Sequence, residues 1–208
     1  MNAILRFWQT PWLRAGLLCG IAGFVDAVGY VDLGGVFAAN MTGNTVLLAM
    51  SVAQGQWANA LVYVITLTSF SAGVAVAYLL EAKHLRVPLL IEALLITVVA
   101  LVAPGKTAAL IMLAGAMGLQ AASMTRFGTV TISTVVVTSV IVRIVEGGVS
   151  RKKPPDIALT MPVLAAAWSA YAIGAAASVA ASPLGDAILL LPVAGLLPFI
   201  FERPHPAT

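Results

Sequence analysis

Long apolar stretches separated by short polar segments run along nearly the whole chain. A helix needs about 20 apolar residues to cross a bilayer. Six stretches are long enough, and they lie at residues 13–31, 59–80, 86–103, 107–125, 157–180 and 184–201. The pattern therefore predicts an all-α polytopic integral membrane protein with six transmembrane helices, forming a single membrane domain over residues 1–208.

Two further apolar stretches, residues 36–53 and 128–147, are shorter or are interrupted by polar residues. If both crossed the membrane, Lys83, Arg86 and Arg126 would fall outside, leaving 8 of the 11 basic residues inside. If neither crossed, Lys106 alone would fall outside, leaving 10 inside. Because cytoplasmic loops are enriched in Lys and Arg, we expect six full spans and two broken or re-entrant helices.

The order of these stretches indicates an internal repeat of about 95 residues, covering residues 13–103 and 107–201. Each half has a first span, a polar interrupted segment and two plainer spans. Asp26-Ala27 aligns with Gln120-Ala121, and Thr42-Gly43 aligns with Thr138-Ser139. Three spans per half would make the repeat inverted, whereas four would make it parallel.

The composition supports a membrane location and excludes several functions. Hydrophobic residues make up 61% of the chain and charged residues 9%, and the mean hydropathy is +1.01. The net charge of +3 comes from basic residues scattered among loops, so we expect no nucleic-acid partner. A single cysteine, Cys19, and two distant histidines, His84 and His205, predict no disulfide, metal or cofactor.

The N-terminal segment carries Arg6 and Arg14 ahead of the first apolar run. That run is longer than a signal peptide and contains no A-x-A cleavage site, so we expect a retained helix with a cytoplasmic N-terminus.

The first span has a face of small residues. Gly16, Gly20 and Gly23 share this face with Asp26, and small residues at this spacing allow membrane helices to pack closely. The opposite side carries large apolar residues and is expected to contact lipid: Leu17, Leu18, Ile21, Phe24, Val25 and Val28.

Asp26 is therefore expected to point into the helix bundle. A carboxyl group inside a membrane is costly, so it usually has a partner or a task. One hypothesis is that it takes up and releases a proton. The alternative is that it holds the next segment through permanent hydrogen bonds.

The sequence Asn40-Met41-Thr42-Gly43-Asn44 follows Gly34-Gly35 and precedes an apolar run. Asn and Thr are good N-caps, so this pattern predicts a helix that starts or restarts inside the membrane. Such a terminus presents N–H groups that can bind an anion or a polar solute. The alternative is a tight interfacial turn capped by its own side chains.

These residues resemble the signature of the YoaK family of small bacterial inner-membrane proteins, a domain of unknown function. The matching residues are Gly23-x-x-Asp26-Ala27, Gly34-Gly35-x-Phe37-x-x-Asn40-Met41-Thr42-Gly43-Asn44-Thr45 and Met117-Gly118-Leu119-Gln120. The resemblance implies about six transmembrane segments over the full chain and a bacterial inner-membrane location. Thr138-Ser139 departs from the second Thr-Gly pair of the family.

The second half offers weaker candidates. Thr134 and Thr138 follow Thr131 at helical spacing and are candidates to line a polar path, although Thr in a helix often bonds its own backbone. Gln120 is a candidate by alignment but lies away from the small face of its span. Glu92 is expected to be an interfacial carboxylate that snorkels or pairs with Arg86.

The leading hypothesis is a secondary transporter of a small polar or anionic solute, coupled to protons. Its site would contain Asp26 with Asn40, Thr42, Gly43 and Asn44, completed by Gln120, Thr134 and Thr138. The alternatives are a structural or accessory membrane protein, including a homo-oligomer, and a passive channel. No catalytic motif of a hydrolase or metalloprotease is present, so an enzyme is not expected.

Overall fold

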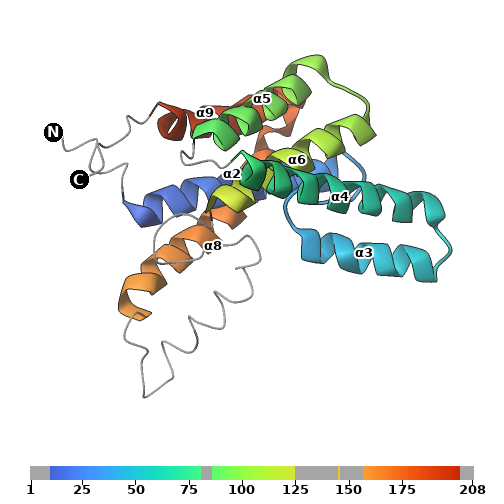
Figure 1. Cartoon of the computed structure of the whole chain (residues 1–208), viewed down its shortest axis with the longest axis horizontal. Coiled ribbons are helices and arrows are strands. Elements are labelled where there is room, and N and C mark those ends of the chain that lie inside the picture. The colour runs from blue at the N-terminus through green and yellow to red at the C-terminus, as the bar shows by residue number, and fades with distance from the viewer. Residues whose placement is uncertain (1–9, 81–85, 125–144, 146–156, 202–208) are drawn as a thin grey trace.

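The structure is a computed structural model that describes residues 10–80, 86–124, 145 and 157–201. Every secondary-structure element in these ranges is a helix (Figure 1). The elements are α2 (Pro11–Val31), α3 (Met41–Ala53), α4 (Trp57–Leu79), α5 (Arg86–Val102), α6 (Lys106–Met124), α8 (Ile157–Ala181), the 3-10 helix η1 (Ser182–Leu189) and α9 (Leu190–Ile200). The prediction of an all-helical chain is confirmed for the described residues.

Helices α2, α4, α5, α6 and α8 begin and end within two residues of the predicted stretches. The prediction of one helix over residues 184–201 is wrong. The chain there forms η1 and then α9, which has only 11 residues. The break occurs at Gly185, whose φ of 61° and ψ of −152° are not helical. A glycine adopts this conformation without the steric cost that a side chain would add.

By length and hydropathy, three of the described helical stretches qualify as membrane spans: Trp12–Val31, Trp57–Leu79 and Pro162–Ile200. The third stretch includes the break at Gly185. The polar segment 36–53 forms α3, whose 13 residues extend about 20 Å and so do not cross a hydrocarbon layer of about 30 Å. The segment 128–147 lies outside the described residues.

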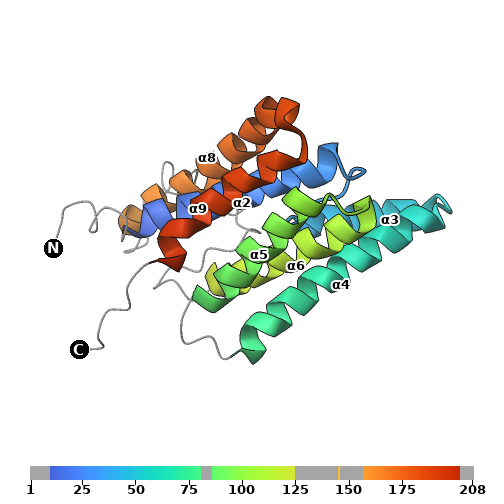
Figure 2. The same ribbon diagram turned by 90° about the horizontal axis from the view of Figure 1, so that it is seen from above.

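Two pairs of helices form the body of the molecule. Helix α2 packs along α8, and helix α4 packs along α6. The colours in Figure 2 show that α2 and α8 run in one direction, whereas α4 and α6 run in the opposite direction. Helices α5 and α9 pack against each other on one side of the two pairs, α5 on α6 and α9 on α2, and α3 packs on α4.

Glycines bring the backbones of α2 and α8 into direct contact. A Cβ atom at Gly23 would lie 2.1 Å from the carbonyl oxygen of Tyr171, and one at Gly174 would lie 2.0 Å from that of Gly20. Both distances are shorter than any atomic contact allows. Gly20 and Gly23 therefore lie where the two backbones meet, whereas a Cβ at Gly16 would have its nearest neighbour at 3.7 Å.

The pair α4 and α6 is built in the same way. A Cβ at Gly118 would lie 2.1 Å from the carbonyl oxygen of Phe70, and one at Gly73 would lie 2.1 Å from that of Gly115. In both pairs a glycine of one helix faces the backbone of the other, and no side chain separates the two helices. Close approach of this kind is typical of membrane helix packing.

The prediction that the large residues of α2 contact lipid is wrong. Leu18 and Val25 are fully buried, and Ile21, Phe24 and Val28 are each 5% exposed. Helices α6 and α9 cover this side of α2, while α8 covers the glycine side. Helix α2 therefore forms the centre of the hydrophobic core.

We predict that Gly23→Ala lowers the stability of the purified protein, because the added Cβ would overlap the backbone of α8. Overpacking typically costs about 1–3 kcal/mol, which for a protein of this size lowers Tm by several degrees. Thermal unfolding in detergent measures the effect. Gly16→Ala, on the same helix, is the matched control, since its Cβ would make ordinary contacts. Equal losses in both variants would contradict the role of close backbone contact.

Candidate functional site

The chain reverses direction between α2 and α3 and packs back along the end of α2. Gly34 and Gly35 adopt φ values of 102° and 78°, and the Gly35 N–H donates to the carbonyl of Tyr30 at 2.9 Å. Phe37 then stacks on Tyr30, with ring centroids 4.9 Å apart. As a result, α3 begins beside Asp26, about 8 Å before the end of α2.

Asp26 binds the backbone at the point where α3 begins. One carboxylate oxygen accepts a hydrogen bond from the Ala39 N–H at 2.5 Å and another from the Asn40 N–H at 3.3 Å. The other oxygen accepts one from the Tyr171 hydroxyl of α8 at 2.5 Å. Asp26 is 2% exposed. The carboxyl group therefore connects α2, α8 and the start of α3.

Two asparagines complete this arrangement. Asn40 is the N-cap of α3, and its side-chain oxygen accepts from the Gly43 N–H at 3.1 Å. Asn44 is fully buried; its amide accepts from the Phe37 N–H at 3.0 Å and donates to the Phe37 carbonyl at 2.6 Å. We call the residues joined by these bonds the Asp26 cluster: Asp26, Phe37, Ala39, Asn40, Gly43, Asn44 and Tyr171.

The electrostatics of the cluster favour an anion. Asp26 lies just ahead of the N-terminus of α3, where the helix dipole is positive and backbone N–H groups are available. The sequence predicted that this terminus could bind an anion. In the structure the bound anionic group is the carboxylate of Asp26 itself. The side-chain oxygen of Asn40 accepts from the Gly43 N–H in the first turn of the helix.

The remaining predicted site residues lie elsewhere. Thr42 is exposed on α3 and does not join the cluster. Gln120 is buried and donates to the carbonyl of Leu18 at 2.9 Å, and Leu18 lies about 12 Å along α2 from Asp26. The structure therefore does not bring Gln120 to Asp26. Thr134 and Thr138 lie outside the described residues.

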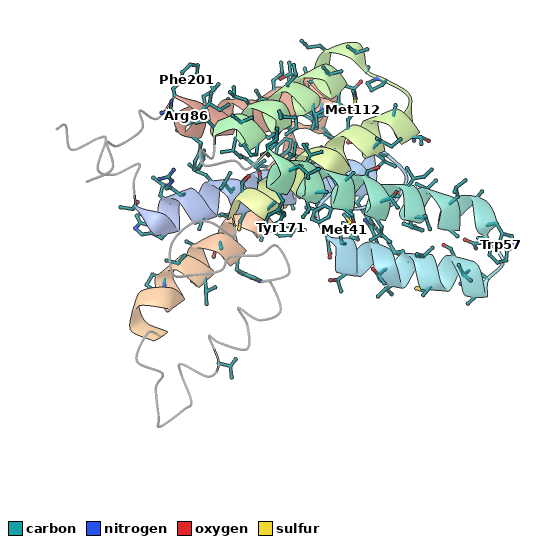
Figure 3. All side chains as sticks on the ribbon, in the orientation of Figure 1. Met41, Trp57, Arg86, Met112, Tyr171 and Phe201 are labelled. Atoms are coloured by element: carbon teal, nitrogen blue, oxygen red, sulfur yellow. The ribbon has the colours of Figure 1, made fainter. Side chains whose placement is uncertain are left out.

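Tyr171 is the cluster residue that sequence reasoning missed. It is a polar aromatic residue within the Ala-rich helix α8, and Figure 3 labels it near Met41, the first residue of α3. Its position in an otherwise apolar span is the signal that could have identified it. Only the packing of α8 on α2 shows that its hydroxyl reaches Asp26.

The expectation for Glu92 is wrong. Its side chain is fully buried, and both carboxyl oxygens lack a hydrogen-bond partner among the described residues. It neither snorkels to the interface nor pairs with Arg86, because α6, α9 and η1 cover the side of α5 on which it lies. In the described part of the chain, no three His, Cys, Asp or Glu residues come together as metal ligands.

Comparison with known proteins places the chain in a family. The family described as "Protein of unknown function (DUF1275)" matches residues 15–201. The chain belongs to the DUF1275 family. A relative in Bacillus subtilis (strain 168), the UPF0700 transmembrane protein YoaK, is 31% identical over 184 residues, which cover 80% of this chain and 82% of the relative. No solved structure matches the chain.

This result confirms the resemblance to the YoaK family and the membrane character of the chain. The DUF1275 match runs through every helix from α2 to α9. The Asp26 cluster thus lies within a transmembrane protein of this family, and its function must be argued from its geometry.

We predict that Asn44→Asp destabilises this DUF1275 protein, because the aspartate has no N–H group to donate to the Phe37 carbonyl. Loss of a partner for a buried polar group costs about 1–3 kcal/mol. Thermal unfolding of the detergent-purified protein provides the measurement. Asn59→Asp is the matched control, because Asn59 is exposed on α4. If the two variants unfold at the same temperature, the amide of Asn44 does not hold the turn.

Proposed function

We propose that this DUF1275 protein is a secondary transporter that carries a small anion together with a proton across the bacterial inner membrane. The observation that carries the proposal is the placement of Asp26. Its buried carboxylate occupies the N–H groups ahead of α3 and joins them to α2 and α8. A titratable carboxylate therefore accepts from the same N–H groups, those of Ala39 and Asn40, that would bind an anionic solute.

Protonation of Asp26 would free this position. A neutral carboxyl group is a weaker acceptor than a carboxylate, because charge-assisted hydrogen bonds are about twice as strong as neutral ones. The N–H groups of Ala39 and Asn40 would then need another acceptor, and a small anion would supply it. One proton and one monovalent anion leave the charge of the buried site unchanged, which avoids the cost of burying an extra charge.

Movement between the two helix pairs would open the site. Within each pair the glycines allow direct backbone contact, and the hydrogen bond from Tyr171 to Asp26 also lies within the α2–α8 pair. Two other polar contacts reach the second pair. Asp26 joins the α2–α8 pair to α3, which packs on α4, and Gln120 of α6 bonds to Leu18 of α2. Hydrogen bonds that cross between the pairs are the ones that protonation or solute binding would change.

The packing also supports an inverted repeat with six spans. The glycines at the two contacts are related by 95 residues, Gly20 with Gly115 and Gly23 with Gly118. Their partners Phe70 and Tyr171 occupy matching places on α4 and α8. In this register Asp26 corresponds to Ala121, one residue beyond the aligned Gln120. Opposite directions of corresponding helices in Figure 2 are what an inverted repeat requires.

Proteoliposomes test the proposal directly. With an inward proton gradient, we expect one or more of the anions phosphate, sulfate, nitrate and formate to enter together with protons. A pH-sensitive dye in the lumen would report the proton entry as a fall in the pH of the lumen. Asp26→Asn should remove the dependence of uptake on the gradient, because the amide does not titrate. Tyr171→Phe should reduce uptake, since it removes a hydrogen-bond donor to Asp26.

Tyr30→Phe is the matched control, because it keeps the ring that stacks on Phe37. Uptake that depends equally on the gradient in the wild type and in Asp26→Asn would contradict the coupling role. Flux that never saturates with anion concentration would indicate a channel.

A structural role is the second candidate, and one observation favours it. Both oxygens of Asp26 already have partners, so the hydrogen bonds alone account for its burial. In that case Asp26→Asn would lower stability, and none of the anions would raise the Tm of the wild-type protein. A bound anion raises Tm by mass action, so this measurement separates the two candidates.

A further inference from the structure

Glu92 lies on the face of α5 that packs into the protein. Leu89, Ala93 and Ile96, at helical spacing around it, are all buried, whereas Leu90 and Leu94 on the other side are 47% and 62% exposed. The elements packed on α5 are α6, α9 and η1. The carboxyl group therefore points toward other helices, and the exposed residues lie on the opposite face.

The surroundings of Glu92 do not compensate a negative charge. Its exposed fraction is zero, and neither oxygen has a hydrogen-bond partner among the described residues. The nearest cation along α5 is Arg86, about 9 Å away along the helix axis. Figure 3 shows Arg86 at the end of the bundle, beside Phe201.

In the described residues of the other elements packed on α5, the charged side chains are Lys106 and Asp186. Lys106 begins α6, at the end of α5 opposite to Arg86, and Asp186 in η1 is itself an acid. The described residues of α9, Leu190–Ile200, include no titratable side chain. Helix α4 also approaches α5, because Ala77 belongs to a hydrophobic cluster against which Ile91 and Leu95 of α5 pack. The titratable residues of α4 are Tyr63 and Tyr78.

An unpaired carboxylate in this place would cost several kcal/mol or more, because nothing replaces its hydration shell. A protonated carboxyl group avoids most of this cost. A metal ion would need further ligands, and no group of three metal-ligating side chains exists in the described chain. The small cation that suits the site is therefore a proton.

We propose that Glu92 is a second proton-binding site, distinct from the Asp26 cluster, whose neutral form is required for α5 to pack against α6 and α9. When the proton leaves, it passes to water, and the carboxylate is stable only where water reaches it between the separated helices. Protonation of Glu92 thus controls the packing of α5. The inference does not depend on transport of a solute.

Two measurements on the full-length protein in detergent test this inference. Infrared spectra of the wild type at neutral pH should contain the C=O stretch of a protonated carboxyl group, and Glu92→Gln should lack it. Asp26→Asn, measured in parallel, separates the contribution of the other buried acid. Absence of the band at neutral pH would overturn the proposal.

The second measurement is thermal stability against pH. Because the neutral form is the one that packs, we expect the wild-type Tm to fall by about 3–5 °C per pH unit over one range of pH. The range begins at about pH 4, where a glutamate of the unfolded chain ionises, and ends where Glu92 ionises in the folded protein. Glu92→Gln keeps a neutral side chain of the same shape and should not show this fall. If the Glu92→Gln variant does not fold, Glu92→Met is measured in its place, because it is also uncharged. A fall over this same pH range that is as large in both variants as in the wild type would overturn the proposal.

Discussion

A buried backbone N–H group has no water to bond and needs a partner within the protein, and in the turn between α2 and α3 one carboxylate is that partner. Asp26 accepts from the two N–H groups that precede α3. Without that acceptor, two buried N–H groups would lack a partner where α3 begins beside the last turns of α2. The position of α3, its packing on α4 and the contact of α2 with Tyr171 all depend on this group.

The glycine contacts serve a different purpose. They bring the helices of each pair so close that no side chain fits between them, and such packing does not rearrange easily. Two polar contacts, in contrast, link one pair to the other: Gln120 of α6 donates to Leu18 of α2, and Asp26 accepts from the backbone ahead of α3, which packs on α4. Asp26 also accepts from Tyr171 within its own pair, so this one acid connects three helices.

Much of the fold could be predicted from the sequence, because apolar length and the glycine face of residues 16–23 are local properties. The start of α3 was also predictable, since Asn40 is an N-cap by its chemistry. The break at Gly185 was not, because a glycine within an apolar run does not by itself show which way the chain turns. The burial of Leu18 and Val25 depends on how many helices surround α2.

The candidate site was predicted in part for the same reason. Asp26, Asn40 and Asn44 lie close in the sequence, and their spacing indicated a shared role. Tyr171 is 145 residues from Asp26, and only the packing of α8 on α2 brings it there. Glu92 looked like an interfacial acid because Arg86 lies nearby in the chain, but the side on which α6 and α9 pack decides its surroundings.

The two glycine contacts are alike, yet only one has a polar pair beside it. Where α2 and α8 bring Asp26 to Tyr171, the matching place between α4 and α6 has Ala121 and Phe70. The acid lies near one end of its helix, so the pair is closer to one surface of the bundle than to the other. The two faces of the bundle are therefore chemically different, because the acid and its hydroxyl partner lie nearer to one face than to the other.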